Sequence, residues 1–269
     1  MSESRFRRLL LTGAAGGLGR VLREKLKPHA DVLRLSDRAD LGAARAQEEI
    51  RLCDLADRRA VMALVEGVDA VVHLGGISVE GPFEPILQSN IVGVFNLYEA
   101  VRKRGVKRVV FASSNHAIGF YRQDEFIDAE VPMRPDGYYG ISKCFGENLS
   151  RFYFDRYGIE TVCLRIGSSF LEPRDRRMLI TWLGYDDLSE LVRSAMFRPG
   201  VGHMVVYGVS ANRDKWWDNG NAMRLGFVAK ESSERFRAKV EAASPALDPG
   251  DPARIYQGGA FVRAGPFED

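Results

Sequence analysis

Three glycines between a predicted strand and a predicted helix constrain the fold of this chain more than any other feature. A short apolar run at residues 9–11 leads directly into Gly13, Gly16 and Gly19, and a helical pattern of apolar residues continues to residue 26. Glycine lets the backbone approach a ligand closely, and a helix start offers free N–H donors and a partial positive charge. The pattern is therefore typical of a turn that holds the pyrophosphate of a dinucleotide.

An acidic residue follows this turn at the spacing expected of a dinucleotide site. The next apolar run, residues 32–36, ends at Asp37, 18 residues beyond Gly19. A carboxylate there accepts hydrogen bonds from both ribose hydroxyls and repels a 2′-phosphate, which favours NAD over NADP. Arg38 beside it weakens this preference slightly. The alternative is a loop glycine cluster followed by a surface aspartate, because 27 glycines in 269 residues produce such spacings by chance.

The composition argues against several classes of partner. A net charge of +2, with lysines and arginines scattered among the acidic residues, argues against nucleic acid and membrane surfaces. No apolar run reaches membrane-spanning length and residues 1–8 lack the apolar core of a secretory signal, so we expect a cytoplasmic protein. The three cysteines are far apart, which suits free thiols, and with the four histidines they show no metal-ligand spacing. No metal site is predicted.

Alternating strands and helices predict an α/β fold with a doubly wound parallel sheet of the Rossmann type. We expect a dinucleotide-binding domain over residues 1–168. Residues 169–269 are expected to form a small substrate-binding cap and tail within the same globule. In that cap we expect a helix over about 185–197, a strand near 204–207 and a helix around 231–243. The final stretch, rich in Pro, Gly and Asp, is expected to run extended over the surface.

Several polar residues lie where predicted strands or helices end. Asp54 follows a short strand at 50–53, where it suits either a contact with adenine or the N-cap of the next helix, and both roles can coexist. His73 lies in a buried strand and is expected to be a hydrogen-bonded core residue rather than a catalytic one. In the long helix expected over about 85–104, Asn90 lies close to the apolar face and needs hydrogen bonds, whereas Asn96 suits the surface.

A tyrosine and a lysine four residues apart suggest acid–base chemistry. Tyr139 and Lys143 lie in a predicted helix that stops at Gly158, so they project from one face. An ammonium near a phenol favours the phenolate and lowers the phenol pKa toward the range of a general base. The preceding strand ends in Ser113, Ser114, Asn115 and His116, which are polar groups that an active site requires.

Taken together, these residues resemble the extended short-chain dehydrogenase/reductases, the relatives of sugar-nucleotide epimerases and dehydratases. The resemblance covers about residues 8–167 and recurs weakly at 186–188 and 225–227. It implies that Tyr139 is the general base and that Lys143 lowers its pKa and holds the nicotinamide ribose. It also implies that Ser114 fixes the reacting hydroxyl and that Asn90 supports a proton relay.

Two departures narrow this resemblance. The chain is short for an epimerase, whose cap encloses a nucleoside diphosphate as well as a sugar, and this favours a free sugar. The sequence from Ser114 to Gly119 also differs from the Ala-Val-Tyr-Gly type of epimerases. With residues 75–78, Ser168 and the arginines of residues 174–177, it resembles the bacterial NAD-dependent uronate dehydrogenases. That resemblance implies oxidation of galacturonate or glucuronate at C1 to an aldarolactone, with NADH as the second product.

A uronic acid requires a guanidinium for its carboxylate and several polar groups for its hydroxyls. We assign the carboxylate to Arg177, with Arg174 or Arg176 as replacements and a solvated loop face as the alternative role of the cluster. Ser78, Ser114, Asn115, His116, Tyr139 and Ser168 are expected to contact the sugar. The residues expected to contact NAD are Gly13, Gly16, Gly17, Leu18, Gly19, Asp37, Arg38, Asp54, Leu55, Leu74, Gly75, Gly76, Ser78, Asn90, Ser114, Tyr139, Lys143 and Ile166.

Two rival functions remain at this point. A sugar-nucleotide epimerase or reductase on the same fold keeps NAD bound and produces no net NADH. A redox-sensing regulator binds the dinucleotide without catalysis, and the joint presence of Tyr139, Lys143 and Ser114 counts against it. A homo-oligomer is also expected, formed through the helix that carries Tyr139, although its aromatic residues could equally be core. These residues are Phe145, Phe152, Tyr153, Phe154 and Tyr157.

Overall fold

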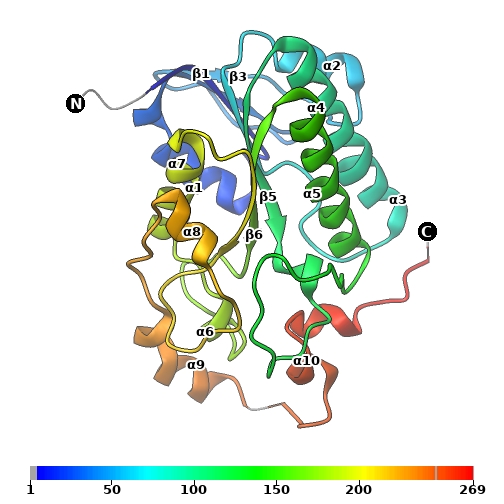
Figure 1. The fold of residues 1–269 in the computed structure, drawn as a ribbon, viewed down its shortest axis with the longest axis vertical. Coiled ribbons are helices and arrows are strands. Elements are labelled where there is room, and N and C mark those ends of the chain that lie inside the picture. The colour runs from blue at the N-terminus through cyan, green and yellow to red at the C-terminus, as the bar shows by residue number, and fades with distance from the viewer. Residues whose placement is uncertain (1–4, 246, 269) are drawn as a thin grey trace.

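A seven-stranded parallel sheet organises the chain (Figure 1), which is described over residues 5–245 and 247–268 in a computed structural model. The strand order is β3-β2-β1-β4-β5-β6-β7. This order reverses between β1 and β4, which is the position where doubly wound sheets bind dinucleotides. The predicted α/β fold is confirmed. The strands are β1 (Phe6–Thr12), β2 (Ala30–Ser36), β3 (Glu48–Ile50), β4 (Ala70–His73), β5 (Arg108–Ser114), β6 (Glu160–Ile166) and β7 (His203–Gly208).

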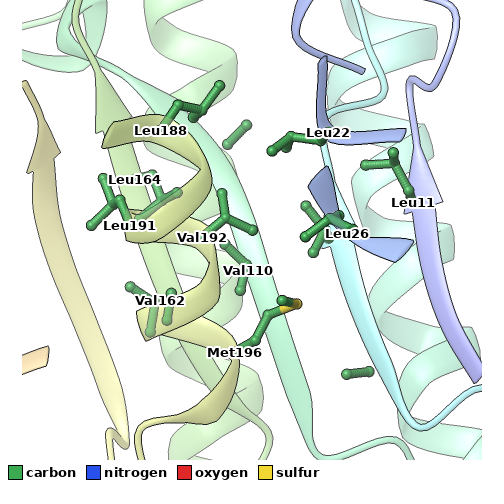
Figure 2. Packing of buried hydrophobic residues seen from close by; sticks show 14 of the residues in the cluster. Leu11, Leu22, Leu26, Val110, Val162, Leu164, Leu188, Leu191, Val192 and Met196 are labelled. Carbon is green, nitrogen blue, oxygen red and sulfur yellow. The ribbon is translucent and has the colours of Figure 1, made fainter. Parts of the chain in front are cut away.

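One face of the sheet is covered by α1 (Gly17–Lys25) and α7 (Tyr185–Phe197). Leu22 of α1, Leu26 immediately after it, and Leu188 and Leu191 of α7 are fully buried against the strands. Figure 2 shows these side chains converging with Val110, Val162 and Leu164 of the sheet. A parallel sheet needs such cover on both faces, which explains why its strands are continuous apolar runs.

The other face is covered by α2 (Arg58–Leu64), α4 (Gly93–Arg104) and α5 (Tyr138–Tyr157). The helix expected over about 85–104 is three joined segments: α3 (Phe83–Ile86), a π-helical turn at Leu87–Val92, and α4. Asn96 is not on the surface. It is buried in α4, where its amide donates to the carbonyls of Leu55 and Ala56 and so fixes the turn after β3.

The segment after residue 168 contributes to the sheet as well as to its rim. The helix α7 and the edge strand β7 belong to the sheet layers, so the expected boundary at 168/169 does not separate the sheet from the cap. The short helices α6 (Met178–Thr181), α9 (Arg237–Ala243) and α10 (Pro252–Ile255) gather at the carboxyl end of the strands (Figure 1). α8 (Gly220–Leu225) packs beside β7.

The end of the chain differs most from expectation. Instead of an extended surface stretch, it forms α10 and a 3₁₀ turn at Gly259–Arg263, and Gly258, Ala260 and Phe261 line the main cleft. Gln257 anchors this segment, because its fully buried amide bonds to Trp217 and to the carbonyls of Arg122 and Glu125. Over the described ranges, no helix combines the length and apolar character of a membrane span.

Candidate active site

The glycine turn forms a cradle that side chains would fill. Gly13 adopts a φ of +71°, and a Cβ there would lie 2.7 Å from the Gly75 nitrogen after β4. A Cβ on Gly19 would overlap the Gly13 carbonyl oxygen, so this glycine allows the helix to start against the turn. Within the described chain, no side chain caps the N-terminus of α1. Its free N–H groups and positive dipole end fit a pyrophosphate.

Asp37 follows β2 next to this cradle. One of its carboxylate oxygens accepts from the Ala15 nitrogen (3.0 Å) and the other from the Ala39 nitrogen (3.1 Å). These bonds hold the carboxylate on the cleft and leave lone pairs for ribose hydroxyls. Asp54 also lies on the cleft, where it pairs with Arg38 (3.7 Å) and accepts from the Ala56 nitrogen. It is not the N-cap of α2, because Asp57 accepts from the first-turn nitrogens instead.

A single cleft of about 1000 Å³ joins the glycine turn to the predicted sugar site. All the residues expected to contact NAD line it except Asn90, and all those expected to contact the sugar line it except Asn115. One end of the cleft carries the carboxylates of Asp37 and Asp54 against the single cation of Arg38. Toward the opposite end the cations of Lys143, Arg174 and Arg177 outnumber the single carboxylate of Asp175, so that end is basic. A dinucleotide and a small anion therefore fit side by side in it.

Asn90 lies in the π-helical turn, behind the cleft. Its amide oxygen accepts from the Ile77 nitrogen (2.8 Å), and its nitrogen donates to the Ile77 carbonyl and to the Ser142 hydroxyl, both at 2.9 Å. Glu80, three residues further along this loop, accepts from the backbone nitrogens of Tyr138 and Tyr139. The loop that carries Ser78 is thus fastened to the start of α5. The proton relay through Asn90 remains a prediction.

Tyr139, Lys143 and Ser114 come together on the cleft, and each is nearly buried. The Lys143 ammonium donates to the Ala112 carbonyl (2.8 Å) and lies 5.4 Å from the centre of the Tyr139 ring. Burial raises the Tyr139 pKa to about 12, although a hydrogen bond with Ser114 opposes the rise. The expected lowering of this pKa is therefore not found, because burial disfavours the phenolate and the nearby Asp136 carboxylate raises the pKa as well. Burial lowers the Lys143 pKa to about 8.

The three arginines of the predicted cluster have different surroundings. Arg176 points away from the cleft and bonds the Ser244 and Glu241 carbonyls of the α9 region. Arg174 lies at the rim with its guanidinium 3.9 Å from the Phe170 ring centre. Arg177 reaches furthest in, and burial lowers the pKa of its guanidinium.

The hydrogen-bond partners of Arg177 are neutral. Its Nε donates to the Gln257 carbonyl (2.6 Å) and its Nη1 to the Ser168 hydroxyl (3.3 Å). The Asn115 side-chain amide is oriented so that its oxygen accepts from Arg177 Nη2 (2.5 Å) and its nitrogen donates to the Ile166 carbonyl. Among the described residues no carboxylate pairs with this guanidinium. A half-buried cation without an anionic partner favours an anionic ligand.

Two aromatic rings enclose the place where a sugar would meet Tyr139. The His116 ring stacks on Phe261 at a centroid distance of 3.8 Å and meets Tyr139 edge-on at 5.7 Å. Sequence reasoning missed Phe261, because nothing in a tail rich in Pro, Gly and Asp marks one phenylalanine. It also missed Glu80, and Asp136, which bonds His116. In the sequence, Asp136 is marked only by its place in an Asp-Gly pair immediately before the helix that carries Tyr139.

Comparisons with known proteins agree with this geometry. The model of the NAD dependent epimerase/dehydratase family matches residues 9–184. A uronate dehydrogenase of Pseudomonas putida is 63% identical over 99% of this chain and 100% of its own length. The crystal structure of uronate dehydrogenase from Agrobacterium tumefaciens is 53% identical, covers 98% of this chain and 99% of its own, and superposes with a TM-score of 0.95. A mutant of that enzyme has been solved in complex with NAD, with 52% identity over 98% of this chain and 100% of its own, at a TM-score of 0.95.

The chain belongs to the NAD-dependent epimerase/dehydratase family. Within this family fold, the crevice between β1 and β4 lies at the end of the cleft that fits a dinucleotide, and the residues after β6 and at the C-terminus form the other end. No group of three histidine, cysteine or acidic side chains that could hold a metal ion occurs in the described part of the chain.

The family cofactor provides a direct test of Asp37. In Asp37→Ala we expect the KM for NAD to rise about ten- to hundredfold, because hydrogen bonds to a charged group are worth roughly 1.5–3 kcal/mol. The KM for NADP should fall relative to that for NAD, since the repulsion of a 2′-phosphate is lost. Asp40→Ala is the matched control, because this exposed carboxylate accepts from the Gly42 nitrogen and lies off the cleft. Equal effects of both substitutions would contradict the assignment.

Proposed function

We propose that this protein oxidises a free hexuronic acid, such as galacturonate or glucuronate, at C1 with NAD and releases an aldarolactone and NADH. The observation that carries this proposal is Arg177, a half-buried guanidinium with neutral partners on the same cleft as Tyr139, Lys143 and Ser114. A carboxylate on the substrate supplies the anion that this guanidinium lacks. The relatives named uronate dehydrogenase support the same substrate class.

The residues of the cleft have separate roles in binding and in proton removal. Arg177, bonded on one side by the buried Asn115 amide, binds the carboxylate and so orients the sugar, while Ser78, His116 and Ser168 bond its hydroxyls. Ser114 holds the C1 hydroxyl against the Tyr139 phenolate, which removes its proton. NAD, when bound, supplies the hydride acceptor and a positively charged ring. Lys143 adds a positive charge beside the phenolate and a donor for a ribose hydroxyl. Leu74, Gly75 and Ile166 provide the backbone and apolar walls of the cleft.

The roles of Tyr139 and Lys143 predict how kcat/KM depends on pH. The active form needs Tyr139 deprotonated and Lys143 protonated, yet in the free enzyme the tyrosine pKa, about 12, lies above the lysine pKa, about 8. The fraction of this form rises about tenfold per pH unit below the lower value and then levels. We therefore expect kcat/KM for NAD to rise up to about pH 8 and to be flat above it. A profile that is flat from pH 6 to 8 would contradict these assignments.

A single absorbance assay at the NADH band tests the function. Galacturonate, glucuronate and a UDP-hexose are offered in turn with NAD. We expect NADH from the two uronic acids and none from the nucleotide sugar. Net conversion of the nucleotide sugar to its epimer without NADH would instead support a sugar-nucleotide epimerase. NAD binding without turnover of any of the three would support a redox-sensing regulator.

We further propose that the enzyme works as a homo-oligomer in the cytoplasm. Phe152 on α5 and Phe95 on α4 are 46% and 40% exposed on neighbouring helices, which supports pairing through this face. Tyr153, by contrast, is buried in the core. The three cysteines are free thiols, which supports a reducing compartment. Sedimentation of the purified protein tests whether it forms a homo-oligomer in solution.

A further inference from the structure

Behind the proposed sugar site lies a buried carboxylate that the mechanism above does not use. Asp136 precedes α5, and its side chain has no exposed surface. Its Oδ2 lies 2.7 Å from His116 Nδ1, and its backbone nitrogen donates to the His116 carbonyl. Its second oxygen, Oδ1, is buried and has no hydrogen-bond partner in the described part of the chain. Its hydrogen bonding is therefore directed at His116.

The fold makes room for this carboxylate with two glycines. A Cβ on Gly119 or on Gly258 would overlap Asp136 Oδ2, and the Gly258 nitrogen donates to the Gly119 carbonyl (2.8 Å). The C-terminal segment that carries Phe261 therefore closes over the His116–Asp136 contact. The stacked Phe261 ring on one side and the Tyr139 ring at its edge leave the imidazole little freedom to rotate.

We propose that Asp136 is a positioning residue that fixes the His116 tautomer, so that Nε2 accepts a hydrogen bond from a substrate hydroxyl. A carboxylate only accepts, so Nδ1 must carry the proton in the contact with Asp136. Neutral imidazole then has a lone pair on Nε2, for which no partner is seen among residues 5–245 and 247–268, although His116 lines the cleft. The His116–Asp136 pair therefore favours binding of a sugar that carries a hydroxyl opposite His116 Nε2 over a deoxy analogue that lacks this hydroxyl. This inference rests on the proposed function.

The charges around His116 support a neutral ring near pH 7. Burial lowers its pKa, and Arg177 lowers it further, whereas Asp136 and Glu80 raise it. Tyr139, which touches the ring, is uncharged at this pH in the free enzyme. In Asp136→Asn the main group that raises the pKa is lost, so His116 should protonate at a lower pH than in the wild type.

Nitrogen NMR of the ¹⁵N-histidine-labelled, NAD-bound enzyme tests the proposal directly. His116 is assigned by its absence in His116→Gln. In the wild type we expect the proton on Nδ1 and an unprotonated Nε2. A proton on Nε2 at pH 7 to 8 would overturn the proposal without any need for the Asp136 variant to fold.

Steady-state kinetics provide a second test of the role of Asp136. In Asp136→Asn we expect the KM for galacturonate to rise about three- to tenfold with the KM for NAD unchanged. The acid-side rise in the galacturonate KM, where Nε2 becomes protonated, should move to lower pH. Asp128→Asn is the control, because this exposed carboxylate accepts from the Glu130 nitrogen and lies off the cleft. An unchanged galacturonate KM and pH profile would overturn the role of Asp136. Failure of the wild type to form NADH from any uronate would overturn the proposed function instead.

Discussion

Tyr139→Phe should lower the rate of NADH formation from galacturonate by a factor of about 10² to 10⁴, which is the usual loss when a positioned base is removed. The phenyl ring keeps the packing against His116 and Phe261, since both contacts involve the ring rather than the hydroxyl. NAD binding, followed by calorimetry, should change little, because the glycine turn and Asp37 are untouched. Only the step that removes the substrate proton is lost.

Tyr138→Phe is the matched control for this substitution. Tyr138 is the preceding residue on the same helix, is 41% exposed and does not line the cleft. It should retain the wild-type rate. Equal rates for Tyr139→Phe and the wild type would refute the assignment of Tyr139 as the base, whereas equal losses in both variants would point to a disturbed helix.

Arg177→Lys should raise the KM for galacturonate about ten- to hundredfold with a smaller change in the KM for NAD. An ammonium cannot make the planar two-point contact that a guanidinium makes with a carboxylate. The expected size follows from charge-assisted hydrogen bonds worth roughly 1.5–3 kcal/mol. The measurement is steady-state kinetics in both substrates. Thermal unfolding is recorded in parallel, because Arg177 also bonds the Gln257 carbonyl.

Arg176→Lys controls for the general effect of changing an arginine in this cluster. Arg176 lies one residue away but bonds carbonyls near α9, so the KM for galacturonate should stay at the wild-type value. If Arg177→Lys leaves this KM unchanged, the carboxylate belongs to Arg174, whose guanidinium lies at the cleft rim.

The sheet and the cofactor half of the cleft could be predicted from the sequence because their signals are local. Gly13, Gly16 and Gly19 mark the turn, and at Gly13 and Gly19 a Cβ would collide with the backbone. The helix from Tyr138 ends at Gly158 as predicted, because this glycine adopts the left-handed conformation. Spacing along one helix was also enough to bring Tyr139 and Lys143 onto the same cleft.

The substrate half depends on contacts between distant parts of the chain. Phe261 reaches His116 only because the buried Gln257 anchors the last segment to the residues around Arg122. Asn96 is buried because the turn after β3 leaves two carbonyls that need donors. The Tyr139 pKa is raised rather than lowered, since the sequence showed the nearby ammonium but not the burial that disfavours the phenolate.

The transfer of hydride from C1 of the sugar to NAD is the central step of the proposed reaction, and isotopic labelling of that carbon tests it. Galacturonate carrying deuterium at C1 is oxidised by the enzyme with ordinary NAD, and the reduced cofactor is examined by mass spectrometry. Hydride transfer from C1 predicts that the NADH gains one deuterium. Unlabelled NADH would show that the hydrogen comes from another carbon, and it would contradict the proposed chemistry.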